Sequence, residues 1–468
     1  MPEKYHIETK PVPPRRPRIG KYGIIDWRED CARCHNCVKK ACVYDRHRDE
    51  VRYIRDMDDV DVIFFDCMGC FSCVQECTKN LLRLTINPEY QKLGNDYWTP
   101  QIIQTTWLQA ETAKIPVSGA GYGGRFSGYG FDSMWTDMSE IVRPTRDGIH
   151  GREYISTAVD IGRKKSFLVM KDGELSTDIP PIISTPMPMI IDMMPEKYGL
   201  DMLDPIIFET AYKTELITLV DSKKWPLQVK NIDKYLPHIA FYFSADAPMI
   251  PAEVLNKTSL AEIENSGNID QRIKELKRIN PEIVVSVRVE LDSEGINRAV
   301  EISKKDVEAI HIVADKNGKQ KGAAKPLFIK DMIRTIHKAM IENGTRDDIT
   351  LISGGGIALP EHMAKALICG TDLDSVDLPI LVALECRLCE TCAGEKSCPA
   401  KIKDAGFDYS VGRMTNLIAA WHDQMVELMG AMGIRDARRL RGDAGRAMFF
   451  EQLEEETFGK LFGKRKQA

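Results

Sequence analysis

The sequence predicts an α/β chain, in which a (β/α)8 barrel follows a small cysteine-rich module and precedes closing helices. Short apolar runs alternate with amphipathic helical segments from about 180 to 385, as in a parallel sheet covered by helices. Two adjacent groups of cysteines come before this region. We expect four segments, namely a two-cluster module with an N-terminal arm (1–95), an irregular glycine-rich connection (96–170), the barrel (171–405) and C-terminal helices (406–468).

The barrel is predicted from repeated strand–helix units. The strand candidates are the apolar runs at 182–191, 215–220, 238–244, 283–289, 308–313, 349–354 and 375–380. Helical spacing of apolar residues predicts helices at 269–279, 294–304, 329–343 and 360–368. A barrel needs eight strands, so seven candidates leave one strand unassigned. An open doubly wound sheet is the alternative architecture.

The two ends of the chain differ in composition. The first 25 residues or so are rich in proline and arginine, which predicts an extended arm. Residues 417–432 and 447–461 have helical patterns and are expected to pack against the barrel.

The charge balance excludes some partners. Lys and Arg total 64 against 69 Asp and Glu, a formal charge of −5, so there is no basic excess that would indicate nucleic acid binding. We find no apolar run of about 18 residues that would predict a transmembrane helix. The polar start lacks a secretory apolar run, and cysteines grouped as metal ligands fit a reducing compartment, so we expect a cytoplasmic protein.

Twelve of the thirteen cysteines fall into three groups. The groups are Cys31, Cys34, Cys37 and Cys42; Cys67, Cys70, Cys73 and Cys77; and Cys386, Cys389, Cys392 and Cys398. Each begins with two successive Cys-x2-Cys steps, which let neighbouring thiolates bind the irons of one cubane. We therefore expect three [4Fe–4S] clusters and transfer of single electrons.

In two-cluster modules the fourth thiolate of each cluster comes from the other motif. This rule predicts one cluster on Cys31, Cys34, Cys37 and Cys77, and another on Cys67, Cys70, Cys73 and Cys42. Structural zinc is the alternative at each group. The remaining thiol, Cys369, is expected to be a small buried hydrophobe.

A glycine-rich turn follows a late strand candidate. Residues 349–353 run into Gly354, Gly355 and Gly356, and a helix is expected near Pro360. In a barrel, such late βα loops can bind a phosphate through backbone N–H groups. A tight structural turn is the alternative.

Residues from about 150 to 450 resemble the FMN-binding synthase domain of glutamate synthases, especially the short archaeal-type proteins that join it to ferredoxin modules. The resemblance rests on residues 181–187, 285–289, 352–357, 411–417 and 432–435, and on Cys398-Pro399 after the last strand. It implies FMN as cofactor. It also implies that Gly354, Gly355, Gly356, Gly370 and Thr371 hold the FMN phosphate.

By the same resemblance, Arg288 stands where the family usually has a lysine facing the flavin. A cation there would stabilise the reduced, anionic flavin; a structural ion pair is the alternative for Arg288. The family's substrate-loop lysine is missing from the segment 243–249. No segment carries a convincing NAD-binding fingerprint.

These observations lead to one main hypothesis and two alternatives. The first is an iron–sulfur flavoprotein that passes electrons between its clusters and FMN, as a subunit of a larger redox complex or with ferredoxin as partner. The second is a ferredoxin-dependent glutamate synthase that joins ammonia to 2-oxoglutarate. The third is a non-catalytic iron–sulfur scaffold whose barrel has lost its flavin.

Overall fold

The computed structural model describes residues 5–16, 19–26, 34, 36, 70–115, 126–136, 154–165, 169–176, 179–195, 198, 201–393, 398–457 and 459–463. The chain divides into two compact units. The barrel unit comprises 1–12, 105–386 and 391–468, and the cysteine unit comprises 13–104 and 387–390. The apolar run at 60–65 also predicts a short strand that leads into the second cysteine group, and it lies outside the described residues.

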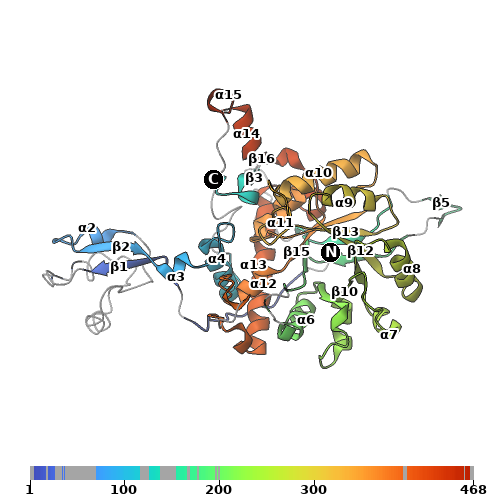
Figure 1. Cartoon of the computed structure of the whole chain (residues 1–468), viewed down its shortest axis with the longest axis horizontal. Coiled ribbons are helices and arrows are strands. Elements are labelled where there is room, and N and C mark those ends of the chain that lie inside the picture. Colours follow the sequence, from blue (N-terminus) through green and yellow to red (C-terminus); the bar gives the residue numbers. More distant parts are fainter. Residues whose placement is uncertain are drawn as a thin grey trace. The chain divides into compact units, whose positions relative to one another are not determined.

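Eight parallel strands form a closed barrel, which confirms the predicted architecture (Figure 1). They are β8 Met189–Ile191, β9 Thr218–Asp221, β10 Ile239–Phe243, β11 Leu260–Glu264, β12 Val284–Glu290, β13 Ala309–Val313, β14 Thr350–Gly354 and β15 Leu373–Val376. The strands follow one another in chain order around the barrel, and β15 pairs with β8 to close it. All five residues of β13 are buried, as expected of parallel strands covered on both faces.

The strand missing from the sequence prediction is β11, with the sequence LAEIE. Its central Glu262 is fully buried and interrupts what would otherwise be an apolar run. The predicted strand at 182–191 is two strands in the structure. Residues 182–185 form β7, which pairs antiparallel with β4 Val159–Gly162 outside the barrel, and only β8 enters it.

The four predicted barrel helices are confirmed with small changes at their ends. They are α8 Ile269–Ile279, α9 Gly295–Ser303, α10 Ile329–Glu342 and α11 Pro360–Cys369. Shorter helices are α6 Asp204–Lys213, α7 Ala252–Leu255 and α12 Leu378–Ala383. Cys369 is buried at the end of α11, as predicted for a small hydrophobe.

The closing segment is partly helical. A 25-residue helix, α13 Phe407–Ala431, packs against α6, α11 and α12. The predicted helix at 447–461 is instead β16 Ala447–Phe449, α14 Phe450–Glu456 and α15 Gly459–Phe462, because β16 pairs with β3 Met134–Thr136. A small hairpin joins β5 Met170–Lys171 and β6 Glu174–Leu175.

The cysteine unit contains a two-stranded antiparallel sheet, in which β1 Tyr22–Asp26 pairs with β2 Leu82–Ile86. Two short helices, α2 Ser72–Gln75 and α3 Pro88–Gln91, flank β2 along the chain, and α4 Pro100–Thr112 begins after them. Cys73 of the second cysteine motif therefore lies within α2, and Cys77 lies between α2 and β2.

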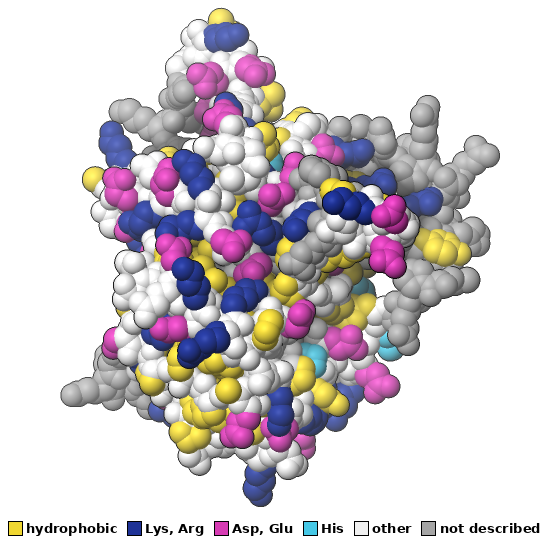
Figure 2. All heavy atoms as spheres, turned by 90° about the vertical axis from the view of Figure 1, so that its right-hand side faces the viewer, with side chains coloured by type: hydrophobic (Ala, Val, Ile, Leu, Met, Phe, Trp, Pro, Cys, Tyr) yellow, Lys and Arg dark blue, Asp and Glu magenta, His cyan; other side chains and the backbone are white. Residues whose placement is uncertain are grey.

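Charges of both signs are interspersed on the face shown in Figure 2, in keeping with the near balance of the composition. Within the described part of the chain, no helix is both long and apolar enough to cross a bilayer.

Candidate functional site

A cavity of about 490 Å³ lies at the carboxyl ends of the barrel strands. It is lined by residues at or just after the ends of β8, β9, β10, β12, β13, β14 and β15. Functional sites of (β/α)8 barrels are built on this face, because the βα loops meet there. Arg288, the predicted flavin-facing residue, is one of the lining residues.

Arg288 is held by two carboxylates inside the barrel. Its Nη1 donates to Asp192 Oδ1 at 3.0 Å and to Glu262 Oε1 at 2.8 Å, and its Nη2 donates to Asp192 Oδ2 at 3.0 Å. The Arg288 side chain is 16% exposed, Asp192 8% and Glu262 1%. The alternative of an ion pair at Arg288 is therefore realised, and the same guanidinium also faces the cavity.

His311 and Ser375 extend this network across the barrel. His311 Nδ1 hydrogen-bonds with Glu262 Oε2 at 2.8 Å, and His311 Nε2 hydrogen-bonds with Ser375 Oγ at 2.8 Å. Ser375 Oγ donates to Asp192 Oδ2 at 3.1 Å. The network thus closes on itself and fixes every polar group that surrounds the guanidinium.

The network keeps both carboxylates ionised. Burial alone would raise the pKa of Asp192, but the charges of Arg288 and His311 lower it to about 2. Burial likewise opposes ionisation of Glu262, and His311 and Arg288 outweigh it, so that pKa is also lowered. The two carboxylates raise the pKa of Arg288 despite its burial. Two carboxylates and one guanidinium therefore lie together at the cavity floor, with the imidazole of His311 beside them.

Tyr242 is a cavity residue that the sequence reasoning missed. It lies near the end of β10, and its ring centre is 5.8 Å from Arg288 Cζ. Burial, followed by the charge of Glu264, raises its pKa to about 12, so the phenol keeps its proton and can donate it in a hydrogen bond. The sequence did contain a signal for this residue, because Tyr242 is a tyrosine one position before the end of a barrel strand.

The predicted phosphate residues do not come together. Gly354 ends β14 and is followed by Gly355 and Gly356 at the carboxyl face of the barrel. Gly370 and Thr371 follow α11 and precede β15. An αβ loop lies at the amino face, so these two residues are at the opposite end of the barrel and their assignment to the same phosphate site is corrected. Gly370 instead accepts a hydrogen bond from Arg346 Nη2 through its carbonyl oxygen, at 2.7 Å.

The three remaining glycines face other parts of the protein. A Cβ on Gly354 would overlap Ser375 Oγ and lie 3.0 Å from His311 Nε2. On Gly355, with φ of +93°, it would lie 2.6 Å from the carbonyl oxygen of Asp315. On Gly356, with φ of +76°, it would lie 2.5 Å from Gly318 Cα. Close packing inside the fold therefore accounts for all three glycines, as in the alternative of a tight structural turn.

The loop after β15 carries an acidic residue, Asp377, which sequence reasoning also missed. Its Oδ1 accepts a hydrogen bond from Leu378 N at 2.6 Å, at the start of α12. Burial, and next the charge of Asp192, raises the pKa of Asp377 to about 6. At neutral pH this loop therefore presents a carboxylate to the cavity.

The two ends of FMN can be tested against this site. A planar ring fits the cavity, because Met193, Phe208 and Leu219 are among its apolar lining residues and Arg288 and Tyr242 supply donors. The phosphate does not fit the predicted glycine turn as a close backbone contact, because protein atoms fill the Cβ side of its glycines and a carboxylate, Asp377, lines the same cavity as Gly355.

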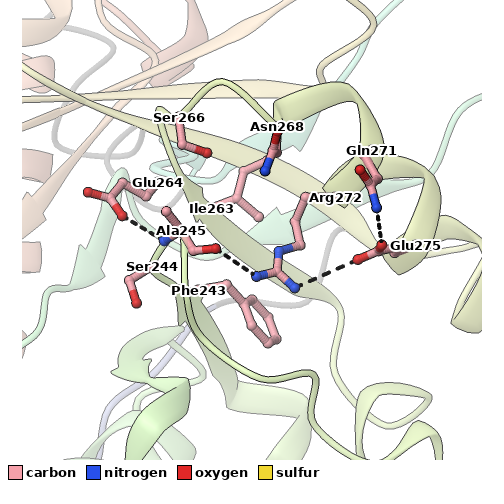
Figure 3. A pocket seen from close by; sticks show the side chains of 10 residues that line it. All are labelled: Phe243, Ser244, Ala245, Ile263, Glu264, Ser266, Asn268, Gln271, Arg272 and Glu275. Atoms are coloured by element: carbon pink, nitrogen blue, oxygen red, sulfur yellow. Dashed lines mark hydrogen bonds and ion pairs between the residues drawn. The ribbon is translucent and has the colours of Figure 1, made fainter.

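A second, smaller pocket of about 160 Å³ lies at the ends of β10 and β11 (Figure 3). Here Arg272 Nη2 donates to the carbonyl oxygens of Ala245 at 3.3 Å and Ala247 at 2.8 Å. Glu264 Oε2 accepts a hydrogen bond from Ala245 N at 2.7 Å. These contacts fix the segment 243–249, in which the sequence lacks the substrate-loop lysine.

Four cysteines of the predicted two-cluster module lie among the described residues: Cys34, Cys70, Cys73 and Cys77. Cys31, Cys37, Cys42 and Cys67 lie outside them. A side-chain hydrogen bond with Ser72, the largest influence, lowers the pKa of Cys70. Burial would raise the pKa of Cys77, but hydrogen bonds from the backbone around Leu81 lower it, with Leu81 N 3.2 Å from Sγ. Both thiols thus favour the thiolate, the form that binds metal.

In the third group, Cys386 is buried and Cys389, Cys392 and Cys398 are half-buried, all without disulfides. Across the parts of the chain that the structure describes, no three metal-binding side chains are gathered closely enough to hold an ion. The cluster assignments of all twelve cysteines stay predictions.

Several solved flavoenzyme structures are similar to parts of this chain. The flavin-binding domain of baker's yeast flavocytochrome b2 gives a TM-score of 0.42 with 10% sequence identity, over 78% of this chain and 92% of that one. Mandelate oxidase with benzoyl-formic acid gives 0.38 with 14% identity, over 66% and 97%.

Sequence comparison gives the more specific result. A model of the conserved region in glutamate synthase matches residues 253–435. An archaeal-type glutamate synthase (NADPH) of Dehalococcoides mccartyi is 25% identical over 90% of this chain and 93% of its own length. The archaeal glutamate synthase (NADPH) of Archaeoglobus fulgidus is 23% identical over 93% and 96%. The chain is therefore similar to archaeal-type glutamate synthases over most of its length, and it is built on a closed eight-stranded barrel.

Proposed function

We propose that the chain is an iron–sulfur flavoprotein that passes electrons between [4Fe–4S] clusters and FMN, as a subunit of a larger redox complex. The observation that carries this proposal is the position of Arg288, immobilised at the floor of a cavity large enough for a flavin ring. Bound FMN would supply the conversion between two-electron and one-electron chemistry.

Arg288 acts in this proposal as a fixed hydrogen-bond donor. The two negative charges of Asp192 and Glu262 exceed the single positive charge of Arg288. These three side chains together therefore carry no net positive charge. A guanidinium has five N–H donors, and the two carboxylates accept three hydrogen bonds from it. The remaining donors can orient a polar edge of a ring, and the apolar residues opposite exclude water from it.

The cysteine unit would supply the one-electron carriers. The lowered pKa values of Cys70 and Cys77 support thiolate ligation, and N–H donors to sulfur such as Leu81 N are one of the features that tune a cluster's potential. Electrons would pass to or from ferredoxin or another iron–sulfur protein.

Two alternatives have their own support. The named activity of the relatives favours a glutamate synthase that uses ammonia and 2-oxoglutarate. The packed glycine turn and Asp377 favour the third hypothesis, an iron–sulfur scaffold without flavin.

The test is the content of iron, acid-labile sulfide and FMN in full-length protein purified without oxygen. We expect about twelve irons and one FMN per chain, as three cubanes and one flavin require. Iron without flavin would select the scaffold, and a colourless zinc protein would contradict the proposal altogether. Formation of glutamate from 2-oxoglutarate and ammonia with reduced ferredoxin would select the synthase.

The role of Arg288 is tested by Arg288→Lys with Arg272→Lys as the matched control. Arg272 lies on α8 and lines the second pocket, and its side chain is 19% exposed against 16% for Arg288. We expect only the change at Arg288 to alter the reduction potential of the flavin. Equal potentials in the two variants and the parent would contradict the role.

A further inference from the structure

We propose that this barrel holds its flavin without using the phosphate, so that riboflavin binds at least as tightly as FMN, and that Asp377 is the residue that sets this selectivity. The inference rests on the proposed function, because it concerns the flavin of that same cavity. Beyond that function, the inference states which flavin the cavity prefers.

The first argument is that the side of Gly355 and Gly356 from which a Cβ would project is filled by the protein itself, so close packing accounts for these glycines without a phosphate. Backbone atoms of Asp315 and Gly318 already lie where side chains on Gly355 and Gly356 would be. The N–H of Gly318 donates to the carbonyl oxygen of Asp315 at 2.9 Å, so the loop opposite the glycines is itself a closed turn. Glycines bind phosphate closely only when the space above their backbone is open.

The second argument is that the carboxylate of Asp377 already uses the backbone N–H of Leu378, a donor that a phosphate at this loop would need. Asp377 accepts the N–H of Leu378 at the beginning of α12, and it lines the cavity. A phosphate at this loop would lose that donor and would lie beside a like charge.

The third argument is the charge of the whole cavity. Six aspartates and four basic side chains line it, so its formal charge is negative. Three of the basic side chains are already paired: Arg288 with Asp192 and Glu262, Lys224 with Asp201 at 2.7 Å and Asp204 at 2.9 Å, and Lys321 with Glu290 at 2.7 Å. A dianionic phosphate would be repelled by the negative charge of this cavity, whereas the uncharged ribityl chain of riboflavin would not be repelled.

The experiment compares the dissociation constants of FMN and riboflavin by fluorescence titration of full-length, cluster-loaded protein freed of flavin. The variants are Asp377→Asn, which keeps an acceptor for Leu378 N, and Asp306→Asn as control. Asp306 is fully exposed and precedes β13, at the amino face, so it makes the same change in net charge away from the cavity.

In the parent protein and in Asp306→Asn we expect riboflavin to bind at least as tightly as FMN. In Asp377→Asn we expect FMN to gain about three- to tenfold in affinity, with riboflavin unchanged, as removal of one nearby like charge predicts. Tenfold tighter binding of FMN than riboflavin by the parent would overturn the inference and leave the proposed function intact. An unchanged ratio in Asp377→Asn would also overturn it. Binding of neither flavin overturns the proposed function, and the inference falls with it.

Discussion

Two arginines, one in each pocket at the carboxyl face of the barrel, have nearly the same exposure but differ in their partners. Arg272 is 19% exposed, donates to backbone carbonyl oxygens of one loop and makes one ion pair with Glu275 at 3.7 Å (Figure 3). Arg288 is 16% exposed and lies between two buried carboxylates. The first arginine fixes a loop, and the second is a member of a charge network that is satisfied only as a whole. Exposure alone therefore does not identify the functional arginine; its partners do.

Removal of Arg288 should have the largest effect on stability, and it tests the comparison of the two arginines most directly. Arg288→Ala leaves Asp192 and Glu262 buried without their cation, and such a loss costs about 3–5 kcal/mol of stability. Urea denaturation of the full-length protein measures it. Arg288→Lys, which keeps the charge and loses the forked geometry, should lose less. A loss below about 1 kcal/mol in Arg288→Ala would show that water replaces the guanidinium and that the network is not closed.

Gly354→Ala tests the other edge of the network. The added methyl group would overlap Ser375 Oγ and approach His311 Nε2, so overpacking should cost about 1–3 kcal/mol. Removal of the obstructing hydroxyl by Ser375→Ala should recover part of this loss, which a double-mutant cycle measures as a coupling of about 1 kcal/mol. Strict additivity of the two changes would contradict the packing role assigned to Gly354.

The sequence predicted the barrel because its signals are local. The apolar runs of β12, β13 and β14 can be recognised without knowledge of their neighbours, and α8 was predicted to the residue. The run predicted as the last strand, 375–380, covers only the end of β15 and continues into α12. The apolar pattern did not reveal β11, because Glu262 interrupts its apolar run. Glu262 accepts a hydrogen bond from Arg288, a residue distant in sequence.

The site was harder to predict than the fold. Arg288 was found through the family resemblance. His311 lies opposite it on the neighbouring strand β13, but Asp192 follows β8, which only barrel closure brings near β12. Gly370 and Thr371 were grouped with Gly354 through the same resemblance. A local match to a family does not say whether a loop follows a strand or precedes one, and that order decides the face of the barrel.

Asp377→Asn is expected to have a smaller effect, and its sign depends on pH. The folded-state pKa of Asp377 is about 6, above the ordinary value of 3.8. The folded state therefore keeps a proton that the unfolded chain has released between these values, and stability falls as pH rises from about 4 to 6. The variant lacks this loss and should be more stable than the parent by about 1–2 kcal/mol at pH 7–8. Urea denaturation should show that the gain disappears near pH 3.5; a gain of equal size at both pH values would exclude titration as its cause.

Arg272→Ala should have the smallest effect of the four and sharpens the contrast with Arg288→Ala. It removes two hydrogen bonds to loop carbonyl oxygens, and Ala245 is exposed, so water can replace the donor there. The neighbouring Glu275 also keeps Gln271 as a donor, at 2.9 Å. We expect a loss of about 1 kcal/mol, measured by urea denaturation beside Arg288→Ala. A loss as large as that of Arg288→Ala would show that the segment 243–249 depends on Arg272 as strongly as the barrel interior depends on Arg288, and the distinction between a loop-fixing and a network arginine would fail.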